Sequence, residues 1–447
     1  MNGKYQDIAQ QVLELARQKG ASQGEVFLLD GEELTIEVAN QQVENLKLAQ
    51  ERGLGFRVLA GQNLGYSFTS DLSTSALAKV VEMAIHNAGY AEPDPNWELP
   101  KAVTNYPSMD LFDEHTSKVA MEEKIRLAQR VEEAARAADP RITITEKSVY
   151  HDSQYSVNIY NTNGLAISYR GSYCGAYTVV VGQENGESQT GLQLQYELKY
   201  NDLDPESIGK TAGLKAVRML GARSVSSARL PIVLEPYTAT SFLGVLQTAF
   251  SGEAVLKGKS FLHGRVGQQV VSPLLSIIDD GTLVKRLGSS PFDGEGVPTQ
   301  ETILVRDGIL QGFLHNTYTA RKSGVPSTGN GVRGTYKSTP EVGITNFYLQ
   351  NGSTASGKVI SDVERGLLIT EVMGMHTANP ITGDFSLGAS GLLIENGQIT
   401  RPVKGIAIAG NLQEILMDIE AVGDDLTFFV GKGSPSLRIG AMSISGS

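Results

Sequence analysis

The stretch from Asn379 to Leu412, NPITGDFSLGASGLLIENGQITRPVKGIAIAGNL, decides the fold of this chain. Two apolar runs of strand length, Leu392–Ile394 and Ile406–Ile408, lie on either side of Asn396-Gly397. These two turn residues tolerate positive φ, so the pattern predicts a β-hairpin. The segment before the hairpin, 382–386, mixes small, acidic and hydroxyl residues with glycines nearby. Such a composition suits a backbone that lies against another strand or a bound chain.

Four more motifs stand in a fixed order around this stretch. They are Ser251–Ser260 (SGEAVLKGKS), Ser290–Thr299 (SPFDGEGVPT), Tyr318–Gly331 (YTARKSGVPSTGNG) and Pro435–Gly446 (PSLRIGAMSISG). Taken together with 379–411, they resemble the TldD/PmbA family, and within it the PmbA (TldE) branch, known by the older name modulator of DNA gyrase. The resemblance covers the second half of the chain strongly and the first half loosely.

Composition limits the classes of function. The chain has 447 residues and a formal net charge of −11, and no cluster of lysine and arginine stands out, which argues against nucleic-acid binding. The single cysteine, Cys174, fits a reducing compartment, and its strand-like surroundings predict a buried, inert thiol. No apolar run reaches membrane-spanning length and the N-terminus lacks a signal core. We therefore expect a cytoplasmic protein with no membrane contact.

Periodicity predicts an α+β fold in two domains. Residues 1–222 read as an N-terminal α/β region of antiparallel sheets with helices, and residues 229–447 as a mainly antiparallel β domain. Helix, strands, helix occurs twice in the first domain, with a proline-rich break near 90–110, so an internal duplication is possible although no residue-level repeat is visible. Helices are expected at about 73–88, 117–138 and 205–220, the last capped by Asp204.

The histidines do not form a known metal motif. All six lie more than ten residues from one another, so neither H-E-x-x-H nor the H-E-x-x-x-H that marks the TldD branch is present. By resemblance, the second motif falls on Gln247, Thr248 and Gly252, whose amide, hydroxyl and bare backbone cannot replace histidine, glutamate and histidine as zinc site residues. The cysteine near the C-terminus of TldD-like chains also has no counterpart at 430–435. The resemblance therefore implies a metal-free chain without catalytic residues, with zinc held by a TldD-like partner.

Other sites were weighed against turns and loops. Convergence of His263, His315 and His376 on acidic residues remains open, but 279–281 and 293–295 are better interpreted as turns. The sequence 252–260 has the wrong spacing for a phosphate-binding loop, and 388–391 lacks the spacing of a nucleophile elbow. The loop 328–331 is interpreted as a flexible loop beside a binding groove.

The glycine-rich polar strands predict a surface that accepts an extended peptide by backbone pairing. The candidate groove residues are Ser251, Thr328, Asn330, Thr382, Asp384, Ser386 and Asn411. The resemblance implies a dimer around an internal channel, in which a TldD-like catalytic subunit cleaves unfolded peptides and this chain, a pseudoenzyme, helps to hold them. Two alternatives remain open: a stand-alone homodimeric peptide-binding protein, and a hydrolase with an unrecognised site.

Overall fold

The computed structural model describes residues 2–446, and its first half is built on one six-stranded antiparallel sheet, here the N-terminal sheet. The strand order is β3-β2-β1-β4-β5-β6. The bounds are β1 Gln23–Ala39, β2 Gln42–Ala60, β3 Asn63–Thr69, β4 Ile142–Asn161, β5 Ala166–Glu184 and β6 Glu187–Glu197. The strands are longer than the apolar runs predict, because backbone pairing continues through polar stretches such as 30–33 where the alternation of apolar side chains stops.

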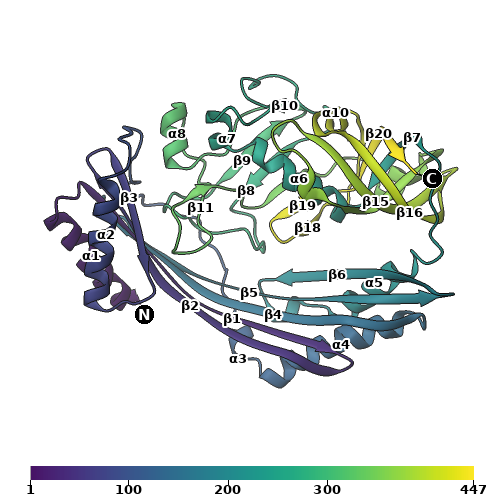
Figure 1. Cartoon of the computed structure of the whole chain (residues 1–447), viewed down its shortest axis with the longest axis horizontal. Coiled ribbons are helices and arrows are strands. Elements are labelled where there is room, and N and C mark those ends of the chain that lie inside the picture. The colour runs from purple at the N-terminus through teal and green to yellow at the C-terminus, as the bar shows by residue number, and fades with distance from the viewer. Residues whose placement is uncertain (1, 447) are drawn as a thin grey trace.

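Helices cover one face of this sheet at its two ends. Figure 1 shows the sheet as a long curved layer, with the C-terminal half resting on one side of it. α1 (Asn2–Gln18) and α2 (Thr74–Ala88) pack on Val26 and Leu28, whereas α4 (Met121–Ala138) and α5 (Pro205–Val217) pack near Leu34 and Ile36. The predicted helix 117–138 is two helices, because α3 (Glu114–Lys118) ends where Val119 and Ala120 adopt extended backbone. The short η1 is Tyr200–Asp202.

The two helix–strands–helix units share a close contact that the sequence does not reveal. A Cβ atom on Gly65 of β3 would overlap the carbonyl oxygen of Ala84 and approach Ala88 in α2. A Cβ on Gly191 of β6 would meet Ala212 and Ala216 of α5 in the same way. Each unit therefore uses a strand glycine to let an Ala-x₃-Ala helix lie directly on the sheet. The internal duplication stays a prediction, with which this repeated contact agrees.

The second half contains two further six-stranded sheets and a short pair of strands. The middle sheet has the order β10-β9-β8-β13-β19-β18, and the barrel sheet has the order β16-β15-β14-β7-β20-β17. Because β16 also pairs with β20, five strands of the barrel sheet close into a ring. The bounds of the strands are β7 Ala228–Leu234, β8 Ile277–Asp280, β9 Glu301–Arg306, β10 Ile309–Leu310, β11 Gly331–Val332, β12 Glu341–Val342, β13 Phe347–Leu349, β14 Arg365–Met373, β15 Asp384–Glu395, β16 Gln398–Asn411, β17 Ile419–Val422, β18 Thr427–Phe429, β19 Lys432–Ser434 and β20 Leu437–Ser445.

The remaining helices are short except for α6, and the bounds are α6 Pro236–Ala249, α7 Gly252–Leu256, α8 Thr317–Ser323, α9 Ser356–Ser361, η2 Met375–Thr377 and α10 Leu412–Met417. One apolar core joins α6 to both sheets of this half and includes Phe242, Leu246 and Phe250. The α+β fold class is confirmed. No helix within residues 2–446 is long and apolar enough to cross a membrane.

The hairpin predicted from the first motif forms as expected. Asn396 and Gly397 have φ values of 52° and 72° between β15 and β16. The glycines of this stretch serve strand packing, since a Cβ on Gly391 would overlap the carbonyl oxygen of Leu368 in β14. The glycine-rich composition was expected to place the backbone against another strand or a bound chain, and Gly391 lies against another strand. Asp204 caps α5 as predicted, accepting a hydrogen bond from the Ser207 amide at 2.9 Å.

Candidate functional site

The three positions aligned with the metal motif do not lie on one helix. Gln247 and Thr248 belong to the last turn of α6, which ends at Ala249. Gly252 opens α7 after Ser251, and its amide donates to the carbonyl oxygen of Leu314 at 2.8 Å. The chain therefore turns between the second and third motif positions, and Gly252 is pinned to the segment that precedes α8.

His315 occupies the space beside Gly252. A Cβ atom on Gly252 would overlap the His315 ring, so that any larger residue here displaces the imidazole. His315 is buried, its Nδ1 lies 3.2 Å from Thr319 Oγ1, and its amide donates to Thr328 Oγ1 at 2.8 Å. Burial lowers its pKa to about 4, so the ring is neutral at pH 7. The sequence signal for this contact is only the glycine itself.

The donor atoms at the motif positions do not fit a zinc site. An amide, a hydroxyl and a glycine offer no imidazole or carboxylate ligand. Within residues 2–446, no group of three or more histidine, cysteine, aspartate or glutamate side chains is placed to share a cation. Of the other two histidines of this half, His263 has its Nδ1 3.1 Å from the Val255 carbonyl oxygen, and His376 lies in η2. The metal-free expectation remains a prediction for metal analysis.

The loop 328–331, which was expected to be a flexible loop beside a binding groove, makes several hydrogen bonds. Thr328 Oγ1 donates to Asn330 Oδ1 at 2.7 Å, and the Asn330 amide nitrogen donates to Asp279 Oδ2 at 2.7 Å and to the Gly343 carbonyl at 3.0 Å. Asn330 is 1% exposed. Ser251, Gly252 and Thr328 thus meet around residues 314–315, while Asn330 points into the protein. Its local sequence gives no sign of this, because its partners are distant in the chain.

Three other candidate groove residues form a second, exposed group at the start of β15 and the end of β16. Thr382 Oγ1 donates to Asp384 Oδ2 at 2.7 Å, and the Asn411 amide nitrogen donates to Asp384 Oδ1 at 2.9 Å. These two hydrogen bonds lower the pKa of Asp384, and the bond from Asn411 has the larger effect. Asn411 also caps α10 through the Gln413 amide, and Ser386 is exposed two residues further along β15. The predicted groove residues therefore divide into two hydrogen-bonded groups.

A cavity of about 250 Å³ lies between the N-terminal sheet and the second half of the chain. Its walls include Tyr155 and Tyr169 from the sheet, and Asp293, Gly329 and Arg333 from the loops above. Burial raises the pKa of Tyr155 to about 12 and holds the pKa of Tyr169 well above its ordinary value. Both phenols are therefore hydrogen-bond donors at neutral pH, and the cavity reaches the glycine of the 328–331 loop.

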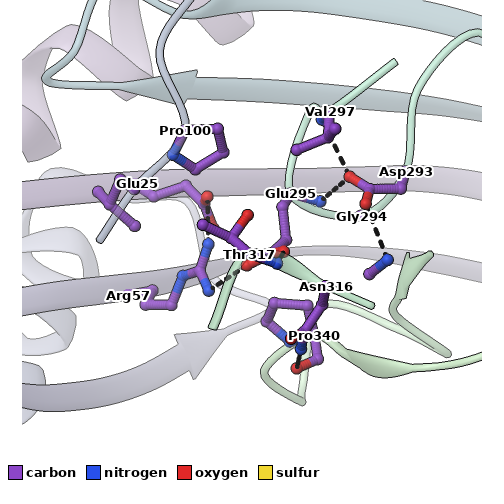
Figure 2. Close-up of polar contacts among 12 residues, drawn as sticks. Glu25, Arg57, Pro100, Asp293, Gly294, Glu295, Val297, Asn316, Thr317 and Pro340 are labelled. Carbon is purple, nitrogen blue, oxygen red and sulfur yellow. Dashed lines mark hydrogen bonds and ion pairs between the residues drawn. The ribbon is translucent and has the colours of Figure 1, made fainter. Parts of the chain in front are cut away.

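Four buried charges join the two halves beside this cavity. Arg57 of β2 donates to Glu25 at 2.7 Å and to Glu295 at 2.9 Å, and Arg333 pairs with Glu25 as well. Glu295 also accepts from the amide of Thr317 at the start of α8, at 2.7 Å. Figure 2 shows Arg57 between Glu25 and Glu295. The interpretation of 293–295 as a turn did not include this role, because the partner cations are far away in the sequence.

Asp293 is a buried carboxylate next to this cluster. It accepts hydrogen bonds from the amides of Glu295 at 2.9 Å, Val297 at 3.0 Å and Gly331 at 2.8 Å, which form the turn that was predicted here (Figure 2). Burial, followed by the neighbouring Glu295 charge, outweighs these bonds and raises the pKa of Asp293 to about 7. Asp279, also predicted in a turn, instead lies within β8, where its buried carboxylate accepts a hydrogen bond from Asn330.

Comparison with known domain families divides the chain into three matched regions. Residues 24–88 match the PmbA/TldA metallopeptidase domain 1, residues 114–220 match the central domain, and residues 227–446 match the C-terminal domain. The first two regions correspond to the two helix–strands–helix units of the N-terminal sheet.

Relatives are similar over nearly the whole chain. The chain is 33% identical to metalloprotease PmbA of Escherichia coli, over 97% of this chain and 94% of the relative. It is 32% identical to a metalloprotease PmbA homologue of Haemophilus influenzae, over 100% and 98% of the two chains. A solved structure from Thermotoga maritima, described as a suggested modulator of a DNA gyrase, has a TM-score of 0.90 at 29% identity and covers 99% of this chain and 100% of that chain. TldE from Thermococcus kodakarensis shares the fold, with a TM-score of 0.90 at 22% identity over 98% and 100% of the chains. The chain therefore belongs to the PmbA/TldD family of metallopeptidase-like proteins.

Proposed function

We propose that this chain is the non-catalytic, metal-free subunit of a cytoplasmic TldD/TldE-type metallopeptidase complex, and that it binds extended peptides for a zinc-bearing TldD-like partner. One observation carries the proposal. At the third motif position, Gly252 has no side chain, and the buried ring of His315 fills the space that a ligand side chain at this position would need. Family membership supplies the metallopeptidase context.

Peptide binding is supported by the exposed polar group at the start of β15. Thr382, Asp384 and Asn411 are exposed or half-buried, and Ser386 continues the same strand. Hydroxyl, carboxylate and amide groups along a strand suit backbone pairing with peptides of many sequences, since such pairing needs little from the peptide side chains. Asn330 has no place in this groove, because its side chain is buried.

Metal content and peptidase activity of the purified chain test the proposal. We expect less than stoichiometric zinc after dialysis against zinc buffer, and no cleavage of an unfolded protein such as casein by the chain alone. Adding a TldD-like protein from the same host should produce zinc-dependent cleavage and copurification. Stoichiometric zinc in the isolated chain, or zinc-dependent cleavage by it, would contradict the proposal.

Two other outcomes have distinct signatures. A stand-alone homodimer would bind unfolded peptides but copurify with no TldD-like protein from its host. A hydrolase with its own site would cleave peptides without the partner. Cleavage that needs no zinc and is abolished by Asp293→Asn would point to the buried carboxyl whose pKa lies near neutral.

A further inference from the structure

A second hollow lies on the opposite face of the N-terminal sheet from the candidate site. In β1, Val26 and Leu28 face the helices, and Asp30 continues that alternation, whereas Glu25 and Phe27 face the C-terminal half. The hollow, here the central pocket, has a volume of about 640 Å³. It is lined by residues that include Tyr5, Asp30, Arg52, Phe112, Asn158 and Arg170. This volume falls within the range typical of small-molecule sites.

One row of side chains crosses the floor of the central pocket. Arg52 of β2 is opposite Asp30 of β1, Asp30 is opposite Ser156 of β4, and Ser156 is opposite Arg170 of β5. The two arginines thus stand at the ends of the row, on strands that correspond in the two repeated units. With a strand spacing of about 4.8 Å, their Cα atoms are roughly 14 Å apart. Side chains as long as arginine can reach inward from both ends toward one bound molecule.

Neither arginine forms an ion pair, although three carboxylates lie nearby: Asp30 is opposite Arg52, Glu32 also lines the pocket, and the charge of Arg170 helps to lower the pKa of Glu114. Within residues 2–446, no ion pair involves Arg52 or Arg170 at the distances that define the other pairs of this protein. The Arg170 guanidinium lies over the Phe112 ring, 3.7 Å from its centre, which fixes the plane of the group and leaves its edge available. Asp30 accepts a hydrogen bond from the hydroxyl of Tyr5. Two cationic donors therefore face the pocket.

Asn158 gives an independent sign of a ligand. Asn158 is 2% exposed and lines the pocket. It follows Ser156 by two residues in β4, so the two side chains lie on the same face of the sheet. The amide nitrogen of Asn158 is buried and has no hydrogen-bond partner within the described residues. An unpartnered buried donor costs about 1–3 kcal/mol, which an acceptor in the pocket would recover. The unmet groups are thus donors: one amide and two guanidinium groups.

We propose that the central pocket binds a small organic anion whose carboxylate or phosphate oxygens span Arg52 and Arg170 and accept from Asn158. An anion supplies acceptors in the number that these donors require, and guanidinium groups bind both carboxylate and phosphate by paired hydrogen bonds. The stacked Phe112 offers an apolar wall for the carbon part of the molecule. The site does not depend on the proposed peptide function, because it lies on the other face of the sheet.

Titration calorimetry on the full-length protein tests this site, with citrate and inorganic phosphate as probes and sodium chloride at matched ionic strength as the blank. We expect saturable binding of at least one probe. Arg52→Gln and Arg170→Gln should each weaken it roughly tenfold or more, which corresponds to the loss of one charged hydrogen bond. Arg306→Gln is the matched control, since Arg306 is an exposed strand arginine of β9, away from the pocket.

A further variant separates binding from folding. Asn158→Leu keeps the shape of the side chain but removes the donor, so it should abolish probe binding without lowering stability to urea. Binding of citrate alone assigns a carboxylate ligand, and binding of phosphate alone assigns a phosphate ligand. Absence of saturable binding by both probes would overturn the proposal, as would equal weakening by Arg306→Gln and Arg170→Gln.

Discussion

Replacing Arg57 by methionine tests how the two halves of the chain are held together. Arg57 is 2% exposed and donates to Glu25 and Glu295, which are 0% and 1% exposed. Without Arg57, Glu25 keeps its ion pair with Arg333, whereas the buried Glu295 loses its cationic partner. Breaking a buried pair in this way costs about 3–5 kcal/mol. Methionine has a similar length, which keeps the loss of packing small.

The assay is urea unfolding followed by fluorescence of the single tryptophan. Trp97 belongs to the connection after α2 and stacks on Tyr318 of α8, with ring centres 3.9 Å apart. Its emission therefore reports separation of α8 from the N-terminal half. A second variant, Arg57→Met with Glu295→Leu, removes a charge of each sign and should recover more than half of the lost stability.

The control is the exposed pair of Arg126 and Glu133, whose side chains are 54% and 46% exposed. Arg126→Met should cost less than about 1 kcal/mol, because water screens this pair. If Arg57→Met destabilised the protein no more than Arg126→Met, the buried cluster would not hold the two halves together as we infer. Failure of the double variant to recover stability would show that the loss was one of packing and not of charge.

Three further predictions concern single positions. Gly65→Ala and Gly191→Ala should each lower the free energy of unfolding by about 1–3 kcal/mol or more, because the new methyl group overlaps a helix carbonyl. The control Gly312→Ala should cost little, since a Cβ atom there meets nothing within 4 Å. Equal losses of stability in urea unfolding for all three variants would contradict this packing. Restoring the metal motif, including Gly252→His, should give an unstable protein without stoichiometric zinc, measured by thermal unfolding and elemental analysis, because the new side chain overlaps His315. For His315, burial lowers the pKa from 6.5 to about 4, so the unfolded chain takes up a proton first as the pH falls. The stability of the unmodified protein should therefore decrease relative to His315→Gln from about pH 6.5 to pH 4, and an opposite slope in pH-dependent unfolding would refute the neutral ring.

Local features of this protein were predictable from the sequence because their causes are local. The Asn396-Gly397 hairpin, the Asp204 cap and the ends of most helices depend on neighbouring residues and on a period of two or 3.6. The absence of an H-E-x-x-x-H motif could also be recognised, because such a motif depends only on neighbouring residues. Strand lengths could not, since pairing carries β1 through polar residues that periodicity assigns to a loop.

The tertiary structure alone decided which distant groups meet. Arg57 and Glu295 are separated by 238 positions in the chain, yet their side chains form a buried ion pair. His315 fills the space beside Gly252, and Arg52 and Arg170 come to the two ends of one row through the order of four strands. Such contacts follow from how whole strands and helices pair and pack. The sequence around each of these residues carries no local pattern that indicates its distant partner. The sequence determined the family, and the fold determined where charge, burial and open space coincide.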